Sequence, residues 1–200
     1  MQMKKKTLIG MTVLFVVGLF GLASCAKAPL MVPTQKLTEK DMNHAIVTFV
    51  RSGVMSPTQK AEIWDRDTPV GELTARAYIQ YQATPGRHLF MSKGKKSDKW
   101  SYIEANLITG EHYVVKVDIL PGGYSAWFKL TPTSPKDGQT SPEDVEKWLN
   151  DLNGKRLLQE MIPTFVEQRG GAAKRAVKAY EEGKMVPEIL SPEDFWPDSH

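Results

Sequence analysis

The stretch Ala45–Arg51 has the sequence AIVTFVR and is apolar at nearly every position, with β-branched and aromatic side chains in succession. A strand with solvent on one face alternates apolar and polar residues. A short, continuous apolar run is instead typical of a strand that is buried on both faces. The sequence therefore predicts a doubly buried strand at residues 45–51, inside a β-rich domain.

Further short stretches of strand composition follow at intervals of roughly 8–12 residues. Within Ala75–Gln82, for example, Ala77, Ile79 and Tyr81 alternate with three residues that would point to the opposite face. The other stretches are Ala61–Asp65, Val70–Leu73, Arg87–Met91, Trp100–Ala105, Glu111–Leu120 and Tyr124–Leu130. Turn residues separate them, and no long helical run lies between them. We expect residues 43–134 to form an antiparallel β-sandwich of seven or eight strands.

Residues 135–200 are predicted to be a helical C-terminal extension. Ser141 and Pro142, followed by two acids, have the composition of a helix N-terminus. An apolar stripe then follows at helical spacing, formed by Val145, Trp148, Leu149 and Leu152. Gly170-Gly171 predicts a hinge or break farther along. The tail either packs on the β domain or contacts a protein partner, and the sequence leaves both open.

The amino terminus has the three parts of a secretory signal peptide. Lys4–Lys6 are basic, the 18 residues 7–24 carry no charge, and Ala23 and Ser24 are small. We assign residues 1–24 to a signal peptide and residues 25–42 to a tether, which contains Pro29 and Pro33. The alternatives are an uncleaved transmembrane anchor and a secreted protein with an incidental cysteine.

Leu22-Ala23-Ser24-Cys25 resembles the lipobox of bacterial lipoproteins. The resemblance implies that Leu22, Ala23 and Ser24 are recognised by the signal peptidase and that the Cys25 sulfur receives a diacylglycerol. It also implies acylation of the new amino group, for example with palmitate. Two or three acyl chains hold a protein on a bilayer far better than one. Residue 26 is alanine rather than aspartate, and similarity to enterobacterial sorting then implies the outer membrane, with the body facing the periplasm.

Charge and cysteine content exclude several classes of protein. Lys4–Lys6 account for the whole net charge of +3, so residues 25–200 are neutral overall. Proteins that bind nucleic acids usually have a basic surplus, and we therefore expect no nucleic-acid partner. The single cysteine excludes an internal disulfide framework and a cysteine-cluster metal site.

Residues with chemical function do not form a known catalytic or metal-binding motif. The four histidines, at positions 44, 88, 112 and 200, lack the spacing of metal ligands. His88 and His112 lie on predicted strands and are the one pair that we would test for catalysis. Glu62, Asp65 and Asp67 form a small acidic cluster, which we interpret as solvated turn residues rather than a Ca²⁺ site. We expect no enzyme activity, no cofactor and no metal.

Ser92–Lys99, with the sequence SKGKKSDK, is the main basic segment of the predicted β domain. Lys93, Lys95, Lys96 and Lys99 could contact an anionic surface such as acidic lipid or lipopolysaccharide. The alternative is a lysine-rich hairpin tip that keeps the protein soluble and discourages edge pairing. Trp64, Trp100 and Trp127 are expected in the core, with a sugar-stacking platform as the alternative.

Several of these stretches together resemble small bacterial lipoproteins with a β-sandwich of unknown function, similar to PEGA-type and carboxypeptidase-regulatory-like modules. The most specific part is a Pro-Gly-x-His hairpin followed by Ala-x-Leu-x-x-Gly-x-x-Tyr, at Pro85, Gly86, His88, Ala105, Leu107, Gly110 and Tyr113. The resemblance implies the fold and an envelope location, and it provides no catalytic residues. We therefore expect a lipid-anchored, non-enzymatic interaction or structural module. The alternatives are an envelope module that binds glycan or lipid and, third, a hydrolase with an unrecognised site.

Overall fold

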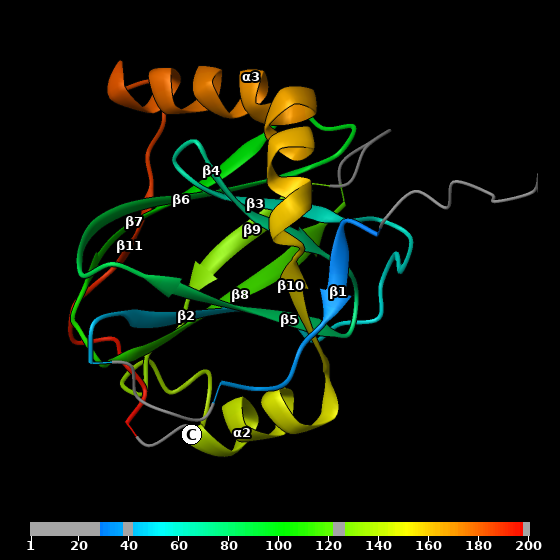
Figure 1. Cartoon of the computed structure of the whole chain (residues 1–200). Helices are drawn as coiled ribbons and strands as arrows, with labels where there is room; N and C mark the ends of the chain where they lie inside the picture. Colours follow the sequence, from blue (N-terminus) through cyan, green and yellow to red (C-terminus); the bar gives the residue numbers. More distant parts are fainter. Residues whose placement is uncertain (1–28, 38–41, 122–126, 198–200) are drawn as a thin grey trace, which may run out of the picture.

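The computed structural model describes residues 29–37, 42–121 and 127–197, and in these ranges eleven strands form two sheets that pack face to face (Figure 1). The first sheet has the order β1 (Met31–Pro33), β10 (Asn153–Leu157), β5 (Ala77–Ala83), β2 (Ala45–Arg51), β8 (His112–Leu120), β9 (Trp127–Pro132). The second has the order β11 (Glu188–Leu190), β7 (Trp100–Leu107), β6 (Gly86–Gly94), β3 (Ala61–Asp65), β4 (Thr68–Leu73). The chain is therefore mainly β, as predicted.

Strand β2 is buried along its entire length, which confirms the doubly buried strand. Ala45, Val47 and Phe49 point into the core that the two sheets share. Val50 points to the other side, where it packs in a second apolar cluster with Trp196. The continuous apolar run of this strand thus reflects one neighbouring layer on each of its faces.

The prediction of an antiparallel sandwich with seven or eight strands is wrong in two respects. Three pairings are parallel: β2 with β8, β10 with β5, and β11 with β7. Parallel neighbours need a long crossover, and here the connections between β2 and β8 pass through the second sheet instead of through a helix. The strand count is higher because short segments outside residues 43–134 complete both sheets.

These additional strands come from both ends of the chain. β1 pairs with β10 on the edge of the first sheet, and β11 is the edge strand of the second. The prediction that residues 135–200 form a helical extension is therefore only partly correct. Within residues 135–197, strands β10 and β11 belong to the two sheets. The predicted strand at Tyr124–Leu130 is observed from Trp127 onward, and residues 122–126 lie outside the described ranges.

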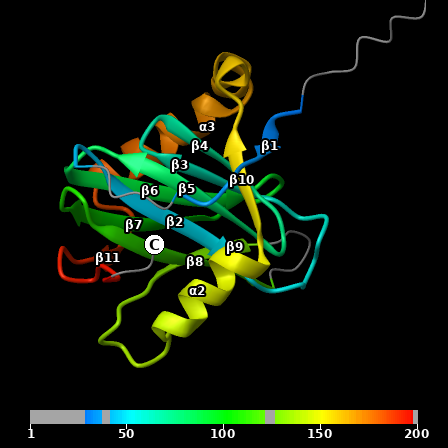
Figure 2. The ribbon, with the colours of Figure 1, turned by 60° about the horizontal axis from the view of Figure 1, so that its bottom comes forward.

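Helix α2 (Pro142–Asp151) covers the outer side of the first sheet, opposite the side that carries α3, as the turned view in Figure 2 shows. Ser141 caps it as predicted, with its hydroxyl accepting from the Asp144 backbone N–H and the Asp144 carboxylate accepting from the Ser141 N–H, both at 3.1 Å. The sequence Ser-Pro-Glu-Asp at residues 141–144 occurs again at residues 191–194, where the carboxylate of Asp194 accepts from the Ser191 N–H at 2.8 Å. The two copies thus share the same turn chemistry.

Helix α3 (Ile162–Glu181) lies on the outer side of the second sheet and is preceded by the 3₁₀ turn η1 (Gln159–Met161). The helix is continuous across Gly170 and Gly171, so the predicted break is wrong. The ribbon instead changes direction near its middle (Figure 1), and paired glycines are a known cause of such bends. No helix in the described ranges is long and apolar enough to cross a membrane.

Candidate functional site

Leu22, Ala23, Ser24 and Cys25, the residues of the predicted lipobox, lie outside the described ranges, as do the rest of the predicted signal peptide and residues 26–28 and 38–41 of the predicted tether. The first described residues of the chain, from Leu30 onward, are hydrogen-bonded to the body. The Leu30 carbonyl accepts a hydrogen bond from the Leu158 backbone N–H at 3.0 Å, and strand β1 follows directly. At 3.3–3.6 Å per residue, the five steps from Cys25 to Leu30 span at most about 18 Å.

Two glycines make room for this N-terminal segment. A Cβ on Gly71 would lie 2.8 Å from the methyl carbon of Met31, and one on Gly154 would lie 2.6 Å from the carbonyl oxygen of Thr34. The Met31 sulfur also accepts a hydrogen bond from the Glu72 backbone N–H at 3.3 Å. The segment 30–34 is therefore packed against β4 and β10 rather than extended from the body.

Beside this segment, Arg169 of α3 joins two glutamates on the second sheet. Its guanidinium donates to Glu62 at 3.2 Å and also to Glu72, and Lys60 donates to Glu72 at 3.0 Å. The side chains of Glu62 and Glu72 are each only 4% exposed. These four residues form what we call the charge cluster, and they connect α3 to strands β3 and β4.

The two carboxyl groups of the charge cluster respond differently to the same arginine. Burial raises the pKa of Glu62 above its usual range, and the attraction of Arg169 only partly offsets this effect. Burial also disfavours ionisation of Glu72, but the hydrogen bonds from Arg169 and Lys60 outweigh it and lower the pKa of Glu72. The arginine therefore pairs mainly with Glu72, and Glu62 is the more weakly stabilised carboxylate.

The predicted basic loop lies next to this cluster. Lys93 sits over the Trp100 ring at 5.4 Å and Lys99 over the Trp127 ring at 5.7 Å, so both ammonium groups are held by cation–π contacts. Lys95 and Lys96 are exposed. In the described ranges, none of these four lysines forms a salt bridge with a carboxylate.

A hollow of about 340 Å³ opens between the basic loop and α3, and we call it the basic hollow. Its lining residues are Glu62, Lys93, Lys95, Gln168, Arg169 and Ala172. Three cationic side chains therefore face one buried carboxylate that is already bonded to Arg169. The excess of positive charge and the amide of Gln168 suit a ligand that bears a negative group.

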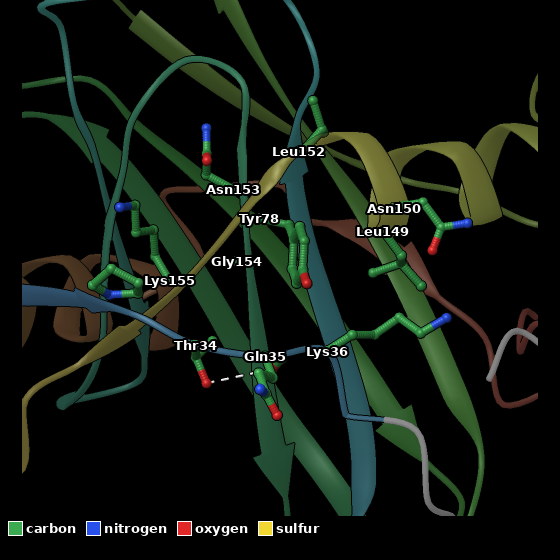
Figure 3. A pocket seen from close by; sticks show the side chains of 11 residues that line it. Thr34, Gln35, Lys36, Tyr78, Leu149, Asn150, Leu152, Asn153, Gly154 and Lys155 are labelled. Atoms are coloured by element: carbon green, nitrogen blue, oxygen red, sulfur yellow. Dashed lines mark hydrogen bonds between the residues drawn. The ribbon is translucent and has the colours of Figure 1, made fainter.

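A larger hollow of about 460 Å³ lies on the opposite side, between the N-terminal segment, α2 and β10 (Figure 3). Tyr78 lies at its base and is 2% exposed, and burial raises the pKa of its hydroxyl. Lys36 and Lys155 are the charged groups among its lining residues, and the others are apolar or uncharged polar. This hollow lacks the convergence of cations that distinguishes the basic hollow.

The structure does not bring His88 and His112 together in one site. His88 Nδ1 donates to the Asp65 carboxylate and Nε2 donates to the Thr84 carbonyl, both at 2.7 Å, whereas His112 shares a 2.6 Å hydrogen bond with Thr48 on the other sheet. Both partners of His88 are acceptors, so the protonated ring is the form that can donate to both of them at once. The hydrogen bond to Asp65 raises the pKa of His88 despite burial.

The predicted acidic cluster is dispersed, and only part of our interpretation of it as solvated turn residues is correct. Asp67 is exposed, but Glu62 is buried in the charge cluster and Asp65 is buried against His88 and Tyr81. Within the described residues, no group of three metal-ligating side chains comes together. The sequence therefore located the acids correctly near a turn but missed the partners that bury two of them.

The three tryptophans have different environments. Trp64 is fully buried beneath α3, where it packs on Phe165 with ring centroids 5.1 Å apart. Trp100 and Trp127 are half-buried, and each has a lysine over its ring. The prediction of core packing is confirmed for Trp64. The other two do not form an open stacking platform, because the loop lysines occupy a face of each ring.

Sequence reasoning missed Arg169, the residue that organises the charge cluster. A usable signal was present, since Arg169 falls four residues after Phe165 and four before Ala173, within the apolar side of the helix. A single arginine at such a position predicts a buried carboxylate partner on the surface that the helix covers.

The chain was also compared with known proteins. No protein-family model matches it, and searches of curated proteins and of solved structures find no match. The resemblance to PEGA-type and carboxypeptidase-regulatory-like modules therefore stays a prediction.

Proposed function

We propose that this chain is a bacterial envelope lipoprotein, anchored through lipid on Cys25, that acts as a non-enzymatic interaction or structural module. The observation that supports this most directly is the lipobox at Leu22–Cys25, followed within five residues by a chain that is hydrogen-bonded into the body at Leu30. An anchor attached this closely holds the whole body at the membrane surface. We place it at the outer membrane, facing the periplasm, on the basis of Ala26.

The titratable side chains of His88 and Asp65 are hydrogen-bonded within the protein, and this supports a non-enzymatic role. A general base needs a ring nitrogen or carboxylate that can reach a substrate. Both nitrogens of His88 are already bonded within the protein, and Asp65 accepts hydrogen bonds from both His88 and Tyr81. These groups have the connectivity of a structural joint between the two sheets.

A lipid-binding module is the second candidate, and the basic hollow favours it over a glycan-binding module. Glycan recognition generally uses exposed aromatic rings, and the rings of Trp100 and Trp127 have lysines over them. The same lysines place positive charge on the side of the molecule where Leu30, five residues after Cys25, packs on the body.

The anchor is tested by Cys25→Ala, with Ser24→Ala as the matched control that keeps a small residue in the lipobox. We expect Cys25→Ala to remain unlipidated and Ser24→Ala to behave like the wild type in membrane fractionation. Intact mass should show wild-type chains that begin at an acylated Cys25. A wild-type chain with a free thiol, or a Cys25→Ala chain that stays membrane-bound at full unprocessed mass even after alkaline extraction, would refute the lipid anchor; the second result would indicate a transmembrane helix.

The choice of membrane is tested separately by Ala26→Asp. By similarity to enterobacterial sorting, this substitution should move the protein from the outer-membrane to the inner-membrane fraction on a density gradient, with Ala26→Ser as the control. Co-fractionation of the wild type with the inner membrane would contradict the outer-membrane assignment and leave the anchor intact.

A further inference from the structure

We propose that the basic hollow between the β6–β7 loop and α3 binds the phosphate of an anionic lipid headgroup in the membrane to which the chain is anchored. This inference rests on the proposed lipid anchor and specifies which face of the body lies against the bilayer. The ligand class is a phosphodiester of an anionic phospholipid.

The charges around the basic hollow favour a phosphate. Arg169 and Lys60 balance Glu62 and Glu72 within the charge cluster. Lys93 and Lys95 are the other lining cations: both attract the Glu62 carboxylate, but neither forms a salt bridge among the described residues. The nearest other acids in the sequence are Asp98 in the loop and Glu167 on α3, both exposed. Phosphate oxygens accept strong, charge-assisted hydrogen bonds from such ammonium groups.

The loop is ordered before any ligand arrives. The Ser97 backbone N–H donates to the Gly94 carbonyl at 2.9 Å, and the Ser97 hydroxyl accepts from the Lys99 N–H at 3.1 Å. The ring of Trp100 beneath Lys93 further restricts that side chain. Binding to an ordered loop costs less conformational entropy than binding to a flexible one.

The first described residues of the chain are connected to the same hollow through the α3 face. Leu30 packs in the apolar cluster that contains Phe165 and Val166, and Arg169 follows Phe165 by about one helical turn. Met31 contacts Glu72 through its sulfur, and Glu72 binds Arg169. The N-terminal segment is thus two contacts away from the hollow, and a lipid on Cys25 is at most about 18 Å from Leu30.

This proximity makes a weak site effective. A lysine near an anionic bilayer contributes roughly fivefold to membrane partition, and the effect decays within about 8 Å at physiological ionic strength. Two or three such lysines do not hold a soluble protein firmly on a membrane. On an anchored body they need only select one orientation, because the anchor has already supplied a high local concentration of headgroups.

The test uses the lipidated mature protein reconstituted into vesicles of phosphatidylcholine alone or of equal parts phosphatidylcholine and phosphatidylglycerol. Lysine acetylation, followed by mass spectrometry, reports the exposure of each ammonium group. We expect several-fold slower labelling of Lys93 and Lys95 in the anionic vesicles. Lys147, which is exposed on α2 on the other side of the body, should label equally in both vesicles.

The matched variants are Lys93→Gln/Lys95→Gln and Lys147→Gln, both with the charge cluster intact. Labelling is then followed at Lys96 on the same loop, which we expect to be slowed in the anionic vesicles when Lys93 and Lys95 are present. We expect the double variant to lose this protection and the Lys147→Gln control to keep it. Arg169 is left unchanged because its loss would leave buried carboxylates unpaired. An unchanged urea-unfolding midpoint shows that the double variant is folded.

The outcomes separate the two levels of the proposal. Equal labelling of the loop lysines in both vesicles overturns the headgroup site and leaves the anchor standing. Protection in phosphatidylcholine vesicles on adding inorganic phosphate, without protection by phosphatidylglycerol, assigns the hollow to a free phosphate and overturns the lipid ligand. A chain without acyl mass on Cys25 that fails to enter vesicles overturns the anchor itself.

Discussion

The two outer faces of the sandwich are both covered by a helix, and they are covered by different chemistry. The α2 face, the outer side of the first sheet, is closed by an apolar cluster formed by Val50, Tyr78, Val114, Val145, Leu149 and Trp196. The α3 face, the outer side of the second sheet, combines an apolar cluster around Trp64 and Phe165 with the charge cluster at its edge. The α2 face is closed by apolar packing and neutral hydrogen bonds, and the α3 face also depends on paired charges.

Each face also buries one tryptophan ring, and the two rings differ in whether the ring N–H has a hydrogen-bond acceptor. Trp196 on the α2 face donates its ring N–H to the Thr133 hydroxyl at 3.1 Å, and its backbone N–H bonds to the His112 carbonyl at 2.7 Å. Trp64 on the α3 face is equally buried, but its ring N–H has no acceptor among the described residues. Buried polar groups without partners are costly, and they often mark a surface that is also selected for something other than stability.

The largest difference between the faces should come from Arg169→Met. This substitution leaves Glu62 and Glu72 buried with less compensation, and we expect a loss of about 3–5 kcal/mol in the free energy of unfolding at neutral pH. Combining it with Glu62→Gln and Glu72→Gln should recover most of that loss, because amides tolerate burial better than unpaired carboxylates. Urea unfolding of the single and triple variants gives both numbers.

The same comparison has a pH dependence with a definite sign. The pKa of Glu72 is lowered in the folded protein, so its pairing stabilises above the ordinary glutamate pKa and is lost as the pH falls through the folded value. The penalty of Arg169→Met should therefore shrink as the pH falls, first when Glu62, whose pKa is raised, takes up its proton and then when Glu72, whose pKa is lowered, takes up its own. A penalty that stays constant down to acid pH would show that Arg169 acts through packing rather than charge.

The second prediction compares the two indoles directly. Trp196→Phe removes a satisfied ring N–H and some packing, and we expect it to cost about 1–2 kcal/mol. Trp64→Phe removes an N–H that has no partner, so it should cost less, although it deletes the same atoms. Thermal and urea unfolding of the two variants provide the test, and equal losses would mean that Trp64 has an acceptor in solution, such as water.

The third prediction concerns the joint between the sheets, where His88 contacts Asp65 and Thr84. The folded-state pKa of His88 is raised, so its contribution to stability is complete below the ordinary histidine pKa of about 6.5 and is lost as the pH rises through the folded value. Each unit by which the pKa is raised corresponds to about 1.4 kcal/mol. We therefore expect the free energy of unfolding of the wild type to fall as the pH rises through the folded-state pKa of His88, and that of His88→Gln to show no such loss.

The source of that effect is checked by NMR titration of the His88 ring. Asp65→Asn removes the main partner and should lower the pKa of His88. Asp67→Asn, two residues away in an exposed turn, is the matched control and should leave the titration unchanged. A His88 pKa that is the same in all three proteins would assign the stabilisation to the Thr84 carbonyl instead of to Asp65.

The comparison of the faces also explains what the sequence could and could not predict. The α2 face was largely predictable, because Ala45–Arg51 and the stripe that includes Val145 and Leu149 follow simple periodic patterns. Trp196 was missed because it belongs to an extended segment without periodicity. Strands β1 and β11 have three residues each, which is too short for a pattern to emerge.

The α3 face was less predictable, since its decisive contacts join distant parts of the chain. Arg169 bonds to residues 97 and 107 positions earlier, and no local composition identifies such partners. Parallel pairing of β2 with β8 was missed for the same reason: strand composition shows where a strand lies but not which strand it pairs with. The basic loop was found from its lysines alone, whereas the hollow beside it required the placement of α3.

The smallest effect should come from Gly171→Ala on α3, and it shows whether the bend of that helix serves the α3 face. Gly171 is exposed, and a Cβ there would meet only the Arg175 guanidinium at 3.7 Å. In an ordinary helix interior, replacing glycine with alanine stabilises by about 0.5–1 kcal/mol. Gly170 provides the control, because it is buried and a Cβ there would press on Val166 at 3.1 Å. A gain at Gly171 and a loss at Gly170 would mean that close packing, rather than backbone strain, requires glycine in this helix. A loss at Gly171 would instead show that the bend needs both glycines, and that the position of Arg169 above Glu62 and Glu72 depends on the path of the backbone.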